Sequence, residues 1–165
     1  MLSRLLNFLI CLFLLFTLPN SISIKAATSN VELIEQNWPF NGIFGRFDKA
    51  SLQRGFKVYS EVCSACHGLR HLSYRDLAGI GYSNDEIKVI AGEYEIIDGP
   101  NDEGEMFTRD AKMSDKFVGP YDNDKVARLA NNGAYPPDLS LIVKARAGGA
   151  DYIYSLLNGY KDFPE

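Results

Sequence analysis

The chain has 165 residues, of which 23 % are charged, so its composition suits one domain with a modest hydrophobic core and is not that of a disordered chain. Its net charge is −4 at neutral pH. This acidic balance argues against nucleic acid as a partner, because a nucleic-acid-binding domain carries a basic surface.

The first 27 residues have the organisation of a targeting segment. Residues 1–4 contain one basic side chain. They are followed by Leu5–Leu18, an almost wholly apolar run of 14 residues, and then by a segment with several small residues up to Ala27. These are the regions of a secretory signal peptide, whereas a membrane span needs about 20 apolar residues and a mitochondrial presequence is amphipathic and rich in Arg and Ser. We therefore predict a signal peptide over 1–27, an exported bacterial protein and a mature domain over 28–165, with an uncleaved anchor as the alternative.

The first elements expected in the mature domain are a coil and two helices. Residues 38–47 are rich in aromatic side chains and contain two glycines, which indicates an ordered coil. A helix capped by Ser51 is expected next, because apolar residues recur at helical spacing after it. The pair Ser83 and Glu86 forms a capping box that opens a second helix, which Gly92 ends.

Three further helices are expected in the C-terminal part. Asp122 or Asn123 opens the first, Asp138 caps the second, and the third covers 150–158 before a glycine. Strand patterns are weak, since only 93–98 alternates and this segment is short. The chain therefore predicts an all-α fold of short helices and long loops.

The pattern that carries chemistry is Cys63, Cys66 and His67, a C-x-x-C-H sequence that is the attachment signature of c-type haem. Two thiols three residues apart can reach the two vinyl groups on one edge of a porphyrin. The adjacent imidazole then lies on the proximal side of the iron. We predict one haem c bound through two thioethers, with His67 as the metal ligand. The all-α domain is then cytochrome c-like and wraps around this haem.

The cysteine pair has three other interpretations. The pair can form a structural disulfide. A thioredoxin-like redox motif follows a strand, whereas here a helix is predicted before the pair. A zinc site needs about four ligands, and the two cysteines and two histidines of the mature chain all lie between Cys63 and His71.

The second axial ligand of the iron stays open. His71 follows His67 by four residues, so a helix would place both on one face and keep His71 from the opposite side of the ring. We expect His71 at the surface or beside the site. A Met thioether would suit electron transfer, and the mature chain has only Met106 and Met113. Each is expected to be a packing or loop residue.

Three segments resemble the cytochrome c1 family, the haem c subunits of the quinol–cytochrome c reductase. They are Arg54–Leu77, Asp98–Phe107 and Ala130–Tyr160, and the resemblance extends over 38–164. It implies a subunit that is not an enzyme by itself. Electrons would arrive from the Rieske iron–sulfur protein and leave to a soluble cytochrome c. The chain would contact cytochrome b at the periplasmic face of a bacterial inner membrane.

The resemblance also implies roles for pocket residues. Arg146 matches an arginine that faces a haem propionate, which a guanidinium can bind with two charge-assisted hydrogen bonds. Tyr152 matches a tyrosine near the haem. The alternatives are a solvated helix end for Arg146 and ordinary turn or core chemistry for the others. The residues that match the pocket loop are Asn131, Ala134, Pro136 and Pro137.

The sequence departs from the family in one respect. The family continues to a distal Met, a core helix and a C-terminal membrane anchor, whereas this sequence stops at Glu165 without a long apolar run after the leader. We therefore expect a C-terminally incomplete family member, held at the membrane through its complex or through the missing anchor. The alternatives are a stand-alone periplasmic cytochrome and a five-coordinate haem sensor or enzyme.

An acidic stretch lies between Asp85 and Glu105, with eight acidic residues and one basic residue, Lys88. It is either a solvated face or a docking patch for a basic redox partner. Opposite charges would speed encounters and keep the association weak and salt-sensitive.

Overall fold

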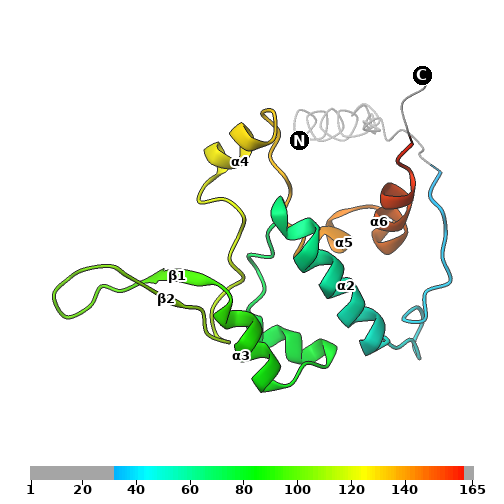
Figure 1. Ribbon diagram of the computed structural model, residues 1–165. Coiled ribbons are helices and arrows are strands. Elements are labelled where there is room, and N and C mark those ends of the chain that lie inside the picture. The colour runs from blue at the N-terminus through cyan, green and yellow to red at the C-terminus, as the bar shows by residue number, and fades with distance from the viewer. Residues whose placement is uncertain (1–31, 162–165) are drawn as a thin grey trace, which may run out of the picture. The chain divides into compact units, whose positions relative to one another are not determined.

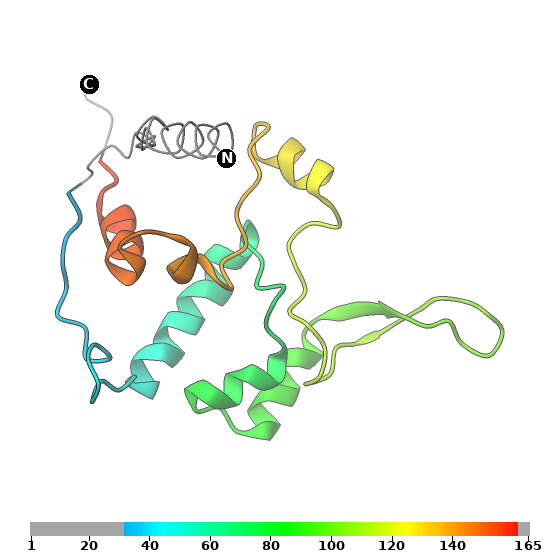
Figure 2. The ribbon, with the colours of Figure 1, turned by 180° about the vertical axis from the view of Figure 1, so that it is seen from behind.

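The computed structural model describes residues 32–161, so the predicted signal peptide over 1–27 lies outside the described residues. Helices and loops make up most of the described chain, together with one small antiparallel sheet (Figures 1 and 2). The prediction of an all-α fold therefore needs this correction. In chain order the elements are α2 (Lys49–Glu61), the 3-10 helices η1 (Cys63–Ala65) and η2 (Tyr74–Ile80), α3 (Asn84–Gly92), β1 (Glu95–Asp98), β2 (Phe107–Asp110), α4 (Asp124–Ala130), α5 (Ile142–Ala145) and α6 (Gly149–Asn158).

Caps fix where the first two α-helices begin. The side chain of Asp48, not Ser51, caps α2, accepting hydrogen bonds from the backbone N–H groups at positions 50 and 51. The capping box that opens α3 is confirmed. Glu86 N–H donates to Ser83 Oγ at 3.3 Å, and Ser83 N–H donates to the Glu86 carboxylate at 2.8 Å.

The three C-terminal helices form near the expected positions. Asn123, and not Asp122, caps α4. The helix expected directly after Asp138 starts only at Ile142, because the Asp138 carboxylate is used between two chain segments instead. Helix α6 follows Gly148, whose φ of +85° is a left-handed conformation that glycine adopts without strain.

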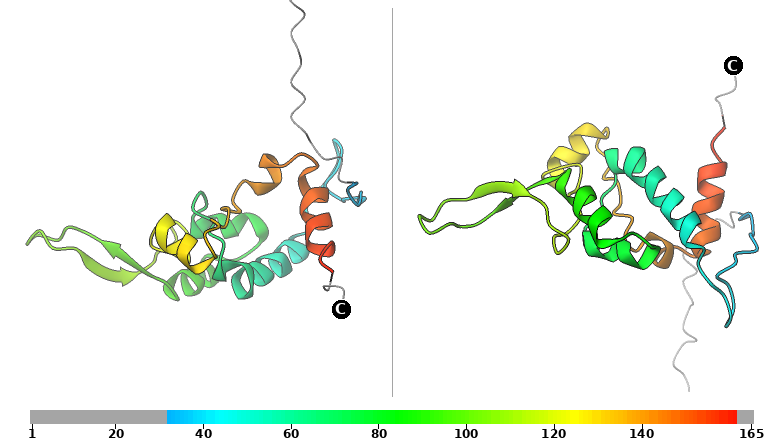
Figure 3. Two further views of the ribbon diagram at one scale, coloured as in Figure 1. Left: turned by 90° about the horizontal axis from the view of Figure 1, so that it is seen from above. Right: turned by 60° about the horizontal axis from the view of Figure 1, so that its bottom comes forward.

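The hairpin β1–β2 pairs Glu95 with Asp110 at one end and Asp98 with Phe107 at the other, and Figure 3 shows the two strands side by side. The alternating segment 93–98 supplies β1, but β2 has no comparable signal in the sequence. The partner strand is therefore decided by cross-strand pairing rather than by its own pattern.

The buried core lies between η2, α3 and the chain that follows β2. Tyr74 is fully buried, with its ring centroid 4.4 Å from that of Phe117 and 5.7 Å from that of Tyr94. Phe56 of α2 joins this cluster edge-on to Phe117. The core contacts α2 through Phe56 and so anchors this helix. The C-x-x-C-H turn that follows α2 lies outside the core. The buried core residues are Tyr74, Leu77, Ile87, Ala91, Ala111 and Phe117.

The predicted coil over 38–47 forms hydrogen-bonded turns, and the chain before it is bound to α6. Asp151 accepts hydrogen bonds from the Gln36 backbone N–H at 3.0 Å and from the Trp38 indole N–H at 2.7 Å. The Trp38 ring stacks on Phe40 and meets Tyr154 edge-on. The start of the described chain is thus fastened to its last helix.

Within residues 32–161, the helices are either too short or too polar to cross a membrane.

Arg109 of β2 ties the hairpin to the following loop. Its guanidinium forms ion pairs with Asp98 across the hairpin and with Asp115, whose nearest oxygen lies 2.7 Å from the arginine. Hydrogen bonds from Arg109 hold the pKa of both carboxyls below their usual range. A carboxyl with a lowered folded-state pKa adds stability at neutral pH that is lost as pH falls below its unfolded-state value of about 4.

We therefore expect R109M to be less stable than the unmodified chain at neutral pH, with a difference that shrinks in acid. Urea unfolding at about pH 7 and about pH 3 would measure both values. K88M is the matched control, because the Lys88–Asp85 pair is exposed and contributes little. If R109M loses as much unfolding free energy at about pH 3 as at about pH 7, the prediction is contradicted.

Candidate functional site

The C-x-x-C-H turn is built by the end of α2. Helix η1 follows α2 directly, and the backbone N–H groups of Cys66 and His67 both donate to the Cys63 carbonyl, at 3.1 and 2.8 Å. Both cysteines are free thiols, Cys63 half-buried and Cys66 exposed, so the disulfide alternative is not formed. A helix and not a strand precedes the pair, unlike in a thioredoxin-like motif. The turn thus presents two thiols and one imidazole from five consecutive residues.

His67 is oriented by contacts from two other elements. Its Nδ1 atom lies 2.7 Å from the carbonyl oxygen of Pro137. A carbonyl can only accept, so Nδ1 carries the proton and Nε2 keeps its lone pair for a metal. The Tyr59 hydroxyl of α2 donates to the His67 carbonyl at 3.1 Å. Burial is the main cause that raises the pKa of Tyr59 to about 12, so the phenol stays protonated as this bond requires.

Three more hydrogen bonds continue the contact between segments 67–71 and 137–140, which we call the ligand clamp. The Leu139 N–H donates to the Gly68 carbonyl at 2.9 Å. The His71 N–H donates to Ser140 Oγ at 3.2 Å. The third bond runs from the Arg70 N–H to the Asp138 carboxylate at 2.8 Å.

The electrostatics of the ligand clamp centre on Asp138. Burial by itself would raise the pKa of this carboxyl, but the hydrogen bonds from Ser140 and Arg70 outweigh it and hold the pKa below its usual range. Asp138 is therefore negatively charged at neutral pH, and its charge balances the positive charge of the nearby Arg70 guanidinium.

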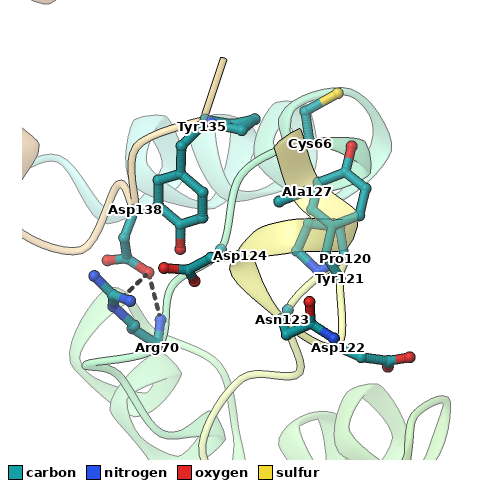
Figure 4. Close-up of a pocket in the computed structure, with 13 residues that line it drawn as sticks. Cys66, Arg70, Pro120, Tyr121, Asp122, Asn123, Asp124, Ala127, Tyr135 and Asp138 are labelled. Carbon is teal, nitrogen blue, oxygen red and sulfur yellow. Dashed lines mark hydrogen bonds and ion pairs between the residues drawn. The ribbon is translucent and has the colours of Figure 1, made fainter. Parts of the chain in front are cut away.

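Two cavities flank the ligand clamp. One, of about 280 Å³, lies between the clamp and the N-terminal end of α4, and Cys66 is part of its wall. Figure 4 shows Arg70 and Asp138 joined by dashed lines on one side of this cavity. The other, of about 330 Å³, is lined by Pro137, Ile142 and Arg146 among others. Arg70, Asp138 and Tyr135 line both cavities, so the clamp separates them.

The other sequence-predicted residues lie at the ligand clamp, beside its two cavities or in α6. Pro137 reaches His67 directly, and Arg146 is exposed at the 330 Å³ cavity. Asn131, at the end of α4, donates to the hydroxyl of Tyr121, which lines the 280 Å³ cavity. Tyr152 is half-buried in the first turn of α6, next to Asp151.

The helical argument for His71 is wrong, because residues 66–71 do not form a helix. The expected surface position is nevertheless observed, since His71 is exposed and lines the 330 Å³ cavity. As predicted, Met113 packs against the core. Met106 is 60 % exposed and lies directly before β2.

Sequence reasoning missed two residues of the site. Tyr59 lies within the helix expected after Ser51 without a role of its own, and Asp138 is predicted only as a helix cap. Both roles depend on contacts between elements, so no local spacing signals them. Asp138 does lie directly after the predicted pocket proline, and this adjacency was the one available hint.

Known proteins are similar to this chain over most of its sequence. The model of the Cytochrome C1 family matches residues 38–165. "Cytochrome c1 1, heme protein, mitochondrial" of Arabidopsis thaliana is 53 % identical over 142 residues, which cover 86 % of this chain and 46 % of that protein. Cytochrome c1 of Rhodospirillum rubrum is 53 % identical over 136 residues, which cover 82 % of this chain and 50 % of that protein.

A third relative carries the name of a complex. "Cytochrome b-c1 complex catalytic subunit, mitochondrial" of Candida albicans is 56 % identical over 128 residues, covering 78 % of this chain and 44 % of that protein. The chain spans about half the length of the curated relatives it matches. The family match over most of the sequence, together with identities above one half, shows that the chain belongs to the cytochrome c1 family.

Proposed function

We propose that the chain binds one haem c covalently and carries single electrons as the cytochrome subunit of a quinol–cytochrome c reductase. The observation that carries this proposal is the hydrogen bond from His67 Nδ1 to the Pro137 carbonyl. It selects the tautomer in which Nε2 can ligate iron, and it does so beside two free thiols. When bound, haem c supplies a one-electron couple at its iron.

The two thiols fit the attachment chemistry. Each Cys S–H would add across one vinyl group: the sulfur would bond to one vinyl carbon, the hydrogen would go to the other, and the carbon–carbon double bond would become single. Two vinyl groups and two thiols would thus give two thioethers, with neither an oxidant nor a reductant consumed. Cys63 and Cys66 are both reduced, as this addition requires.

The surrounding residues would complete the binding site. Arg146 is exposed at a cavity beside the ligand clamp, where its guanidinium can pair with a propionate. Asn131 is held by Tyr121 and by the Ala127 carbonyl, so its loop is fixed at the edge of the other cavity. Tyr152 of α6 would be the tyrosine near the haem. These assignments follow from the family resemblance.

The partners and the location follow from the family as well. Electrons would arrive from the Rieske iron–sulfur protein and leave to a soluble cytochrome c, with cytochrome b as the membrane neighbour. The site would lie at the periplasmic face of a bacterial inner membrane. The name of the Candida albicans relative supports assembly with a b-c1 complex. The acidic loop between β1 and β2, with Asp102, Glu103 and Glu105, supports docking of a basic carrier.

Reconstituted membranes test this function. We expect quinol to reduce the haem of the chain only when cytochrome b and the Rieske protein are present, and the reduced chain to pass electrons to added cytochrome c. The purified haem-loaded chain without these partners is the control. Direct reduction of that chain by quinol, or unchanged quinol oxidation in membranes that lack the chain, would contradict the proposal.

A further inference from the structure

Asp138 connects the two segments that meet at His67. Its Oδ2 atom accepts a hydrogen bond from the Arg70 backbone N–H at 2.8 Å, and its Oδ1 atom accepts one from the Ser140 backbone N–H at 3.0 Å. Only 10 % of the Asp138 side chain is exposed. One carboxylate thus ties the chain after the C-x-x-C-H turn to the loop that carries Pro137.

The position of Asp138 in the chain gives this contact a consequence for the imidazole. Asp138 follows Pro137 directly, and the Pro137 carbonyl accepts the His67 Nδ1 proton. A Cβ atom at Gly68 would lie 3.3 Å from the carboxylate, so a glycine there allows the close approach. Any shift of Asp138 relative to Arg70 would therefore move the Pro137 carbonyl relative to His67.

We infer that Asp138 is a positioning residue for the haem ligand: by holding segment 137–140 against segment 67–71, it fixes the hydrogen bond between His67 and Pro137. This inference rests on the proposed function, because it treats His67 as the iron ligand. A hydrogen bond from the remote nitrogen of a metal-bound imidazole fixes the ring orientation and raises the basicity of the ligating nitrogen. Asp138 therefore acts on the iron through Pro137 and His67 without touching it.

The variant D138N tests this inference, because the amide keeps the size of the carboxylate but turns one of its two acceptors into a donor. One of the N–H groups that face Asp138 then loses its partner. The ligand clamp should open more often, and exchange of the His67 Nδ1 proton with deuterium should become about tenfold faster. Proton NMR of the reduced, haem-loaded full chain would measure this rate. The reduction potential should rise as well, because a weaker ligand stabilises the oxidised iron less.

Two controls separate positioning from charge and from stability. D124N removes an acidic charge from the same cavity wall as Asp138 and is expected to raise the potential without changing the exchange rate. D115N removes a half-buried carboxylate that, like Asp138, accepts from a backbone N–H and forms an ion pair with an arginine, but it lies beside the hairpin. It should lower the melting temperature and leave both haem readouts unchanged.

The outcomes are distinguishable. If the denatured wild-type chain carries no haem that can be stained in a gel, the proposed function is overturned, and with it this inference. If the wild-type chain carries haem and the exchange rate of the His67 Nδ1 proton is the same in the wild type and in D138N, the inference alone is overturned. If D138N does not retain haem, S140A gives the same measurement, because it removes the hydroxyl that accepts from the His71 N–H and that also hydrogen-bonds to the Asp138 carboxylate. An exchange rate that S140A leaves unchanged would then overturn the inference.

Discussion

Replacing both Cys63 and Cys66 by serine is expected to abolish haem staining of the denatured chain. A serine hydroxyl is a much poorer nucleophile toward a vinyl group than a thiol, so neither bond to the porphyrin forms. Haem held only by His67 would be lost when the chain unfolds in the gel. Each single variant should keep one bond, and therefore some colour.

The spectrum separates the single variants from the wild type. One unreacted vinyl group stays conjugated with the porphyrin, so the absorption band of the reduced, pyridine-treated haem should move to longer wavelength. S64A is the matched control, because Ser64 lies between the two cysteines and its hydroxyl donates to the Ser60 carbonyl of the same helix end. Haem that co-migrates with the denatured double variant would refute thioether attachment at these two positions.

Truncating Tyr74 to alanine should cost about 3–5 kcal/mol of unfolding free energy, which is a large share of the stability of a small domain. Tyr74 is fully buried and contacts the ring of Phe117, so its removal leaves a cavity at the centre of the core. Because the same core anchors α2 through Phe56, the loss should also loosen the C-x-x-C-H turn.

Urea unfolding of Y74A and Y74F would measure this cost. The phenylalanine keeps the ring and loses only the hydroxyl that accepts from the Val118 N–H, so Y74F should lose about 1 kcal/mol. The pKa of Tyr74 is raised to about 12, chiefly by burial, so the hydroxyl is neutral in the folded chain at ordinary pH. Equal losses in Y74A and Y74F would show that the hydroxyl, and not the ring, carries the stability.

Local features of the fold could be read directly from the sequence. The capping box of Ser83 and Glu86 is formed as expected, because both partners lie within one helical turn. The expected cap Ser51 is replaced by Asp48, three residues earlier, whose carboxylate accepts from the backbone N–H groups at positions 50 and 51. Both residue types can cap a helix, so the local sequence does not choose between them. Strand β2 could not be read, since its extended conformation is imposed by pairing with β1.

The sequence by itself determined the chemistry: two thiols and an imidazole within five residues lie in one turn whatever surrounds them, and long family segments identify the kind of domain. Only the tertiary structure decided how the imidazole is held. The partners of His67 and Arg70 lie 70 and 68 residues further along the chain, and no local pattern encodes contacts across such a distance. These contacts form only when the fold brings segments 67–71 and 137–140 together, so the tautomer and orientation of His67 are properties of the folded chain.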